Sequence, residues 1–278
     1  MALITLTTDF GTTDGYAGIM KGVILSIAPG TSLVDLTHEI APQDIRAAAF
    51  VLQSACPYFP RGTIHVVVVD PGVGTERRAL AVRTAQAMYV GPDNGVLSWA
   101  WQEQRIETMV SLTQPAYWLP EISRTFHGRD VFGPVAGHLA RGLPVEQLGA
   151  PVADPVVLPL PRPSRGADGA IHSEVIYIDR FGNLVTGIRV QSRDLRILNL
   201  PPEEGRRALD QAATIEILGR QLHPLERTYG AVASGQAVAL IGSSGYLEIA
   251  VRDGSAAALL QAHIGDAVDI TFNEVTGR

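Results

Sequence analysis

The sequence predicts a mixed α/β domain, built on a mostly parallel sheet, followed by a small β-rich domain. Two observations predict the first domain. The chain begins by alternating short β-branched runs with helical patterns, and the Val-rich run from Ile64 to Val69 does not alternate apolar with polar residues, as in a strand covered on both faces. One observation predicts the second domain: after a proline-rich stretch, most strand-like runs alternate apolar and polar residues, as half-exposed antiparallel strands do.

The elements of the first domain follow from periodicity and from residues that stop helices. Ile19, Val23 and Ile27 recur at helical spacing, and the pattern stops at Pro29-Gly30. Pro42 has the place that proline favours in the first turn of a helix. The expected strands are Leu3–Thr8, Ser32–Leu36, Val66–Val69, Ala79–Arg83, Met88–Val90 and Thr108–Leu112, and the expected helices are Tyr16–Ala28, Ile45–Cys56, one from Gly95 and Arg129–Arg141.

A proline-rich stretch separates the two domains. Five prolines lie between Pro151 and Pro163, which is typical of a semi-rigid linker. We therefore expect an α/β domain over residues 1–150, a linker over 151–168 and a β-barrel domain over 169–278. The strands of the second domain are expected in the runs His172–Ile178, Thr214–Ile217, Tyr246–Val251 and Ala267–Phe272.

The composition argues against several classes of function. The 278 residues carry a formal net charge of -6 and only 22 Lys and Arg, so no basic face predicts binding of nucleic acid or of an anionic membrane. The only cysteine, Cys56, is interpreted as core packing, which argues against disulfides and thiolate metal sites. No run reaches the ~18 apolar residues of a membrane span, and the chain begins as a strand without a basic leader, so we expect a cytoplasmic protein.

The most informative stretch follows the buried run that ends at Val69. Asp70 comes directly after this strand, where ligands bind in parallel sheets, and Pro71-Gly72-Val73-Gly74 follows it. This glycine-rich turn can bring backbone N–H groups close to a ligand and returns the guanidinium of Arg77 towards Asp70. Asp70 is therefore a candidate for chemistry; the alternative is that it caps a turn.

Asp9 repeats this pattern at the end of the first strand. It would point into the same crevice as Asp70, where a carboxylate can accept hydrogen bonds from two neighbouring hydroxyls, as acidic groups do with ribose. Asp14, at the start of the next helix, is expected to cap it. The sequence lacks the Gly-x-Gly-x-x-Gly and Gly-Lys-Ser/Thr cradles for pyrophosphate, so the ligand need not carry phosphate.

His127 is the best candidate for a catalytic histidine. It lies next to Gly128 in a loop that a ligand could approach, and the company of Asp70 and Arg77 favours function over structure. A weaker hypothesis is that Asp9, Asp70, His127 and Asp179 bind a divalent metal, although no tight ligand spacing supports it.

Two stretches of the second domain could contact a ligand. Asp179, Phe181 and Asn183 offer a carboxylate, an aromatic face and an amide, which suit an ammonium, a flat base and the base's polar edge. The tract Gly242–Tyr246 offers hydroxyls and backbone N–H groups that could hold a carboxylate. For both stretches, an ordinary β-turn is an equally good explanation.

Six motifs together resemble those of the S-adenosylmethionine (SAM) hydroxide adenosyltransferases, hydrolases related to fluorinase and chlorinase. They span both predicted domains. The motifs are Thr8–Asp14, Val69–Arg77, Gly91–Gly95, Phe126–Asp130, Asp179–Asn183 and Ser244–Ala250.

The resemblance implies a Rossmann-like first domain, a C-terminal β-barrel and a homotrimer with active sites between one subunit's N-domain and its neighbour's C-domain. It also implies that water or hydroxide displaces L-methionine from the ribose C5′ of SAM, giving adenosine, without a metal or cofactor. Asp70, Arg77 and His127 match the family's catalytic residues. The implied substrate-binding residues are Asp9 for ribose, Asp179 and Ser243 for the methionine part, Phe181, Asn183 and Tyr229 for adenine, and Phe126.

Two features favour water over halide as the nucleophile. Enzymes of the fluorinase type resemble this chain but carry a tyrosine where Asp70 stands, and they have an inserted loop in the region of Val82–Tyr89. A negative carboxylate repels halide but accepts a hydrogen bond from water. Gly242 departs from the family pattern, since asparagine is frequent at that position. A halogenase and a SAM-binding sensor without turnover are the alternatives, and the three candidate catalytic residues argue against the sensor.

Overall fold

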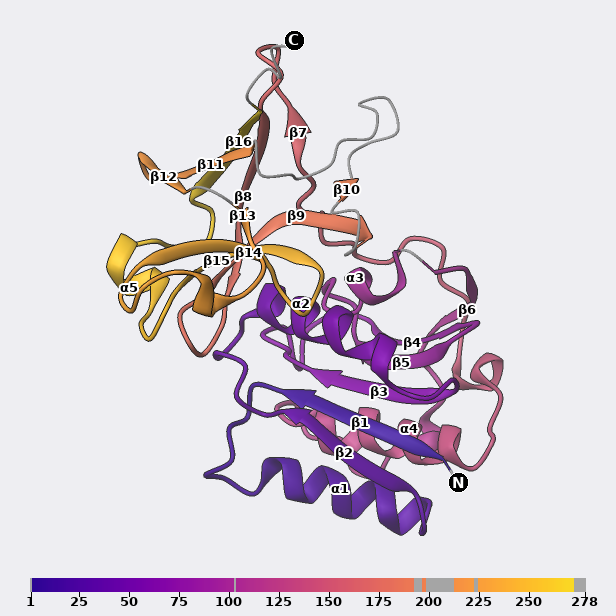
Figure 1. Cartoon of the computed structure of the whole chain (residues 1–278). Helices are drawn as coiled ribbons and strands as arrows, with labels where there is room; N and C mark the ends of the chain where they lie inside the picture. Colours follow the sequence, from indigo (N-terminus) through magenta and orange to yellow (C-terminus); the bar gives the residue numbers. More distant parts are fainter. Residues whose placement is uncertain (1, 103, 193–196, 199–212, 223–224, 273–278) are drawn as a thin grey trace. The chain divides into compact units, whose positions relative to one another are not determined.

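The chain divides into two units within its proline-rich segment. The structure, a computed structural model, describes residues 2–102, 104–192, 197–198, 213–222 and 225–272 (Figure 1). The first unit is Met1–Pro159 and the second is Leu160–Arg278. The division lies inside the segment that the sequence predicts as a linker. Within the described residues, no helix is long and apolar enough to cross a membrane.

Six strands form the sheet of the first unit, in the order β2-β1-β3-β5-β4-β6. All strands run parallel except β4, which is antiparallel to both of its neighbours, so the expected mostly parallel sheet is confirmed. The central strand β3 is buried at all six positions, as its Val-rich run without alternation predicts, and the buried positions include Thr63 and His65. The strands are β1 (Leu3–Thr8), β2 (Ser32–Thr37), β3 (Thr63–Val68), β4 (Ala79–Thr84), β5 (Ala87–Pro92) and β6 (Ile106–Ser111).

Helices cover both faces of this sheet. Figure 1 shows α1 and α4 together on one face and α2 with α3 on the other. Ile24 of α1 and Val135 of α4 pack into one core with Ile4 and Val66 of the sheet. The α-helices are α1 (Tyr16–Ile27), α2 (Ile45–Ala55), α3 (Ser98–Trp101) and α4 (Gly133–Ala140). Short 3-10 turns are η1 (Cys56–Tyr58), η2 (Pro115–Tyr117) and η4 (Val145–Leu148), and η3 (Gly128–Phe132) is a π-helical turn.

Several helix starts differ from the prediction. Asp14 does not cap α1: Gly15 is the N-cap, no side chain caps it, and the exposed first turn can bond to water instead. Pro42 lies before α2 rather than in its first turn, because Asp44 is the N-cap and accepts a hydrogen bond from Ala47 N at 2.8 Å. The helix expected from Gly95 begins only at Ser98, since Gly95 has a left-handed φ of 91°.

Ten strands form the sheet of the second unit, along the path β12-β11-β16-β8-β9-β15-β14-β13, with β10 on β9 and β7 on β8. Contact between β12 and β14 bends this path into a nearly closed, barrel-like sheet. The strands are β7 (Ser164–Arg165), β8 (Ile171–Ile178), β9 (Leu184–Ser192), β10 (Ile197–Leu198), β11 (Ala213–Ile217), β12 (Arg220–Leu222), β13 (Leu225–Glu226), β14 (Ala237–Ile241), β15 (Tyr246–Val251) and β16 (Ala267–Phe272).

One strand of the second unit departs from the expected alternation of exposed and buried residues. All six residues of β15 are buried, including Glu248, because β15 lies between β9 and β14 in the interior of the sheet. The unit also contains the turn η6 (Tyr229–Ala231) and the helix α5 (Ala256–Leu260). Burial of a glutamate in the middle of an apolar strand calls for a physical reason.

Candidate active site

Two neighbouring parallel strands bring Asp9 and Asp70 to the same edge of the first sheet. Thr8, the last residue of β1, pairs with Val68, the last residue of β3. Asp9 follows β1 directly, and Asp70 comes two residues after β3. The expected juxtaposition at the carboxyl ends of the strands is therefore present, and both aspartates line one pocket of about 420 Å³.

A tight turn returns the chain from Asp70 to Arg77. Val73 N donates to Asp70 O at 3.1 Å, and Thr75 Oγ1 donates to Gly72 O at 2.7 Å. Gly74 has a φ of 76°, and a Cβ at this position would lie 2.2 Å from the carbonyl oxygen of Arg124. Glycine is therefore required here because this loop approaches the loop that carries His127.

Arg77 binds the carboxylate of Asp70 through a bidentate contact. Its Nε lies 2.9 Å from Oδ1 and 3.0 Å from Oδ2 of Asp70, and its Nη2 donates to Oδ2 as well. The Asp70 side chain is 5% exposed and that of Arg77 is 11% exposed, so this ion pair is largely shielded from water. Such a pair fixes the carboxylate in one orientation.

The same guanidinium contacts His127, fifty residues along the chain. Arg77 Nη2 lies 2.8 Å from His127 Nδ1. Because a guanidinium can only donate, Nδ1 is the acceptor, and the neutral imidazole carries its proton on Nε2. Burial first, and then the charge of Arg77, lower the pKa of His127, against smaller opposing effects of Asp70 and Asp130. His127 is thus held neutral, with an N–H group at its far side.

A buried carboxylate fixes the turn that presents His127. Asp130 is fully buried within the π-helical turn η3, where its Oδ1 accepts from Arg129 Nε at 2.6 Å and its Oδ2 accepts from Ser123 N at 2.7 Å. The Arg129 guanidinium lies 5.3 Å from the centre of the Phe126 ring. Through these contacts Asp130 fixes the loop on both sides of His127. Turns of π-helix are frequent at functional sites.

The lining of this first pocket includes Asp9, Asp70, Phe126 and His127 but not Arg77. Arg77 therefore acts on the pocket through Asp70 and His127. Asp9 Oδ2 accepts a hydrogen bond from Gln43 N at 2.8 Å, which orients the carboxylate at the pocket wall.

Phe10 and Tyr16 are pocket residues that the sequence analysis missed. The Phe126 ring lies edge to face against both of their rings, with centroids 5.7 and 5.1 Å apart, and the rings of Phe10 and Tyr16 are tilted by 58° with centroids 5.8 Å apart. Phe10 lies in a loop and Tyr16 at the start of a helix, and an aromatic residue at either place carries no signal that separates a pocket wall from an ordinary surface residue.

The residues predicted in the second domain also meet in one pocket, of about 680 Å³. It lies within the second unit and contains all five predicted ligand-binding residues of that domain together with Glu248. The predicted residues are Asp179, Phe181, Asn183, Tyr229 and Ser243.

Asp179 organises a turn as well as facing this pocket. Its Oδ1 accepts from the backbone N–H groups of Phe181 and Asn183, both at 2.9 Å, and its Oδ2 accepts from Asn183 Nδ2 at 2.9 Å. The turn leaves Phe181 77% exposed, with an aromatic face open to a ligand. The β-turn and the ligand-binding interpretation are thus compatible, because the turn sets out the side chains at the pocket.

Glu248 is a third pocket residue that the sequence analysis missed. It lines the same pocket from β15 and is 7% exposed, and its Oε1 accepts from Tyr229 Oη at 2.6 Å. The available signal was a glutamate inside the apolar run Tyr246–Val251, but a single charged residue in a predicted half-exposed strand reads as surface.

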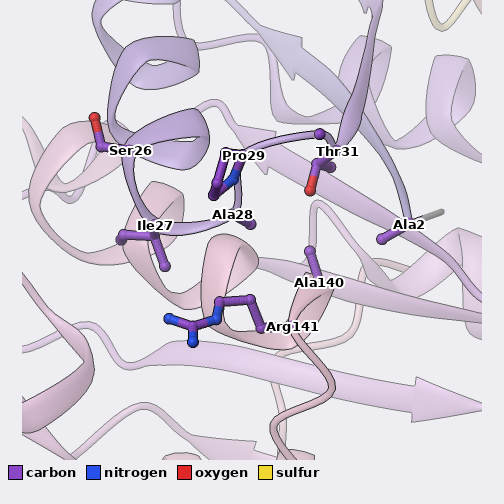
Figure 2. Close-up of a pocket in the computed structure, with 9 residues that line it drawn as sticks. Ala2, Ser26, Ile27, Ala28, Pro29, Thr31, Ala140 and Arg141 are labelled. Atoms are coloured by element: carbon purple, nitrogen blue, oxygen red, sulfur yellow. The ribbon is translucent and has the colours of Figure 1, made fainter.

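Other groups are less suited to chemistry. A depression of about 570 Å³ lies where α1 and α4 end (Figure 2), but Arg141 is the one ionisable residue in its lining, so it holds no acid–base pair. Burial raises the pKa of the Cys56 thiol to about 12, so the thiol is a poor nucleophile. In the described part of the chain, no three His, Cys, Asp or Glu side chains are grouped closely enough to hold a metal ion.

Comparison with known proteins identifies relatives over nearly the whole chain. Residues 4–149 match the SAM hydroxide adenosyltransferase N-terminal domain, and residues 173–269 match the C-terminal domain of the same family. The chain is 41% identical over 266 residues to an (R)-S-adenosyl-L-methionine hydrolase of Thermus thermophilus, covering 92% of this chain and 94% of that protein. A fluorinase of Actinoplanes is more distant, with 28% identity over 89% of this chain and 90% of its own length.

A solved structure has the same fold over most of the chain. The crystal structure of a conserved protein from Thermotoga maritima superposes with a TM-score of 0.82 at 32% identity, covering 96% of this chain and 99% of that one.

Proposed function

This chain belongs to the SAM hydroxide adenosyltransferase family, and we propose that Asp70, Arg77 and His127 activate the water molecule with which it hydrolyses SAM. The reaction gives adenosine and L-methionine. The observation that carries the assignment of these residues is the contact of one guanidinium with both a carboxylate and an imidazole that line the pocket containing Asp9.

The chemistry requires a nucleophile rather than an acid. The sulfonium of SAM leaves as a neutral thioether, so the leaving group needs no proton. The water oxygen attacks C5′ as the C5′–S bond breaks, and the bonding electron pair passes to sulfur. The barrier therefore lies in aligning water opposite that bond and in removing its proton.

The geometry divides these tasks between Asp70 and His127. Because Arg77 donates to His127 Nδ1, the imidazole offers Nε2–H and can donate a hydrogen bond to the water oxygen. The carboxylate of Asp70, fixed by the same guanidinium, keeps an acceptor site on Oδ1 for the water proton. Arg77 is a positioning residue, because it reaches the pocket only through these two side chains.

The remaining predicted residues provide the binding surface. We assign Asp9 to the ribose hydroxyls, Phe126 to the wall beside it, Asp179 and Ser243 to the methionine part, and Phe181, Asn183 and Tyr229 to adenine. The exposed ring of Phe181 and the oriented amide of Asn183 support the adenine assignment, since a flat base needs a stacking face and a polar partner.

We further propose a homotrimer in which the first unit of one subunit and the second unit of its neighbour bind the same SAM molecule. This assembly and the Rossmann-like description of the first unit rest on the family resemblance, and the cytoplasmic location stays a prediction. An Asp70→Ala subunit and an Asp179→Ala subunit, each inactive alone, should recover partial activity after dissociation and joint reassembly. No recovery in proven mixed trimers would place the whole site within one subunit.

The test of the reaction is hydrolysis of SAM in water labelled with heavy oxygen. We expect adenosine with the label at its 5′ oxygen, in the presence or absence of a chelator. Adding chloride or fluoride should give no halogenated nucleoside, because Asp70 stands where the halogenases of this family carry tyrosine. Adenosine without label would rule out attack by water, and a 5′-halogenated product would support the halogenase alternative.

A further inference from the structure

Glu248 is a buried residue whose carboxyl group takes no part in the proposed reaction. It lies in the middle of β15 between β14 and β9, opposite Leu240 and Val185. Its side chain nevertheless reaches the pocket that contains Asp179 and Ser243. A carboxyl so placed loses hydration, and proteins tolerate this when a partner or a ligand compensates it.

One hydrogen bond orients this carboxyl, and a neighbouring glycine leaves room for it. Tyr229 Oη donates to Oε1 at 2.6 Å. On the other side, Oε2 lies where a side chain at position 242 would begin, since a Cβ on Gly242 would be 2.5 Å away. Gly242, the departure from the family pattern, therefore leaves room for the carboxyl of Glu248 beside Ser243.

The electrostatics of the pocket favour a cationic ligand at Glu248. Burial is the main reason why the pKa of Glu248 is raised; the hydrogen bond from Tyr229 opposes this effect, and the charge of Asp179 adds to it. Arg252 also lines the pocket, but its guanidinium donates to the carbonyl of Val232 at 2.8 Å and lies 3.6 Å from the carboxylate of Asp253. A positive group that enters between Glu248 and Asp179 would offset both carboxylates.

The two carboxyls are not equivalent as acceptors. Asp179 already accepts three N–H groups of its own turn, two at Oδ1 and one at Oδ2. Among the described residues, the side-chain donor to Glu248 is Tyr229, whose Oη contacts Oε1. Glu248 therefore has the greater capacity to accept from a ligand ammonium.

We propose that Glu248 is a specificity-determining residue that accepts a hydrogen bond from the α-ammonium of the amino-acid part of SAM. The inference rests on the proposed function. The exocyclic amine of adenine is a less suitable partner, because it is neutral and leaves a buried negative charge uncompensated. Position 248 also lies against Gly242, the neighbour of Ser243, which we assign to the methionine part.

The test compares two substrates with two forms of the complete protein. One substrate is SAM, and the other is its sulfonium analogue that keeps the carboxylate but lacks the α-amino group. Glu248→Gln keeps the size of the side chain and an acceptor for Tyr229 but removes the negative charge. We expect kcat/KM for SAM to fall about 10- to 100-fold, mainly through KM, while the value for the analogue is unchanged.

Glu216→Gln is the matched control, because Glu216 belongs to β11 of the same unit and does not line the pocket. It should leave both substrates unaffected. Equal losses for SAM and the analogue in Glu248→Gln would reduce Glu248 to a structural role, and no loss for SAM would also overturn the proposal.

A second variant reaches the same carboxyl without changing it. Gly242→Ala places a methyl group 2.5 Å from the position of Oε2, so Oε2 must move, and it can do so because it is the end of a flexible side chain. The same selective loss for SAM is expected, and an unchanged preference would contradict the proposal. If the wild-type protein released no adenosine from SAM, the proposed function would fail. The role of Glu248 would then be tested by calorimetric measurement of the affinity for L-methionine and for its analogue without the amino group. Equal affinities would refute that role.

Discussion

Substitution Arg77→Lys tests whether the shape of the guanidinium, rather than its charge, prepares the site. Arg77 contacts both oxygens of Asp70 and also His127 Nδ1 at 2.8 Å. An ammonium keeps the charge but cannot make both sets of contacts from one atom. Losing a hydrogen bond of this charged kind is worth ~1.5–3 kcal/mol, so kcat should fall about 10- to 150-fold. KM should change little, because Arg77 does not line the pocket.

The same substitution should change the pH dependence. In the wild type, burial and Arg77 lower the pKa of His127, so the neutral ring that the mechanism needs persists below the ordinary histidine pKa of about 6.5. Without a donor at Nδ1, protonation there becomes easier and the pKa rises. Activity is lost as pH falls through this pKa, so the acid limb of kcat should move to higher pH in Arg77→Lys.

The assay is chromatographic measurement of adenosine release at saturating SAM across this pH range. Arg78→Lys is the matched control, since Arg78 Nε pairs with Asp93 at 2.8 Å in the same unit but outside the pocket. The control should keep the wild-type kcat and acid limb. The reasoning is refuted if Arg77→Lys retains the wild-type kcat with an unmoved acid limb, or if its loss is confined to KM.

Three further predictions follow from the same contacts. The variants Asp70→Ala, Arg77→Ala and His127→Ala should each lower kcat ~10²-fold or more, with a smaller loss of substrate binding. The losses in the double variants should be strongly non-additive, because the three groups act on one water molecule. Double variants whose loss equals the product of the single losses would contradict a shared water. Gly74→Ala should lower both stability and turnover, since its Cβ would lie 2.2 Å from Arg124 O, whereas Gly142→Ala, with a similar left-handed φ and no atom within 4 Å of its Cβ, should keep full turnover. Burial lowers the pKa of His65 to about 4, so between about pH 6.5 and 4 the unfolded chain binds a proton at this residue that the folded chain does not. This difference should reduce the free energy of unfolding by roughly 3 kcal/mol as the pH falls from about 6.5 to 4. In denaturant unfolding, the stability of His65→Phe should therefore depend less on pH.

The sequence by itself determined the elements and the residues that carry the motifs. Periodicity is a local property, and the boundaries of β1 therefore match the expected range Leu3–Thr8. The Val-rich run through Val67 predicted a strand buried on both faces, and β3 is buried at every position. Because Asp9 and Asp70 each follow a predicted parallel strand, the sequence also predicted that both lie at one edge of the sheet, and the pairing of β1 with β3 confirms this. The motifs predicted the family, and the family models confirm it over both domains.

Only the tertiary structure decided how the candidate groups meet. The contact between Arg77 and His127 joins loops fifty residues apart, and it depends on the close approach of Gly74 to Arg124, which no local pattern encodes. That contact in turn fixes which nitrogen of His127 carries its proton. Glu248 shows the same limit: its sequence position indicates a half-exposed strand, but packing between β9 and β14 buries it and turns its carboxyl into a pocket. The sequence determines which chemical groups the chain carries. The burial of these groups and their hydrogen-bond partners depend on segments that come together only when the chain folds.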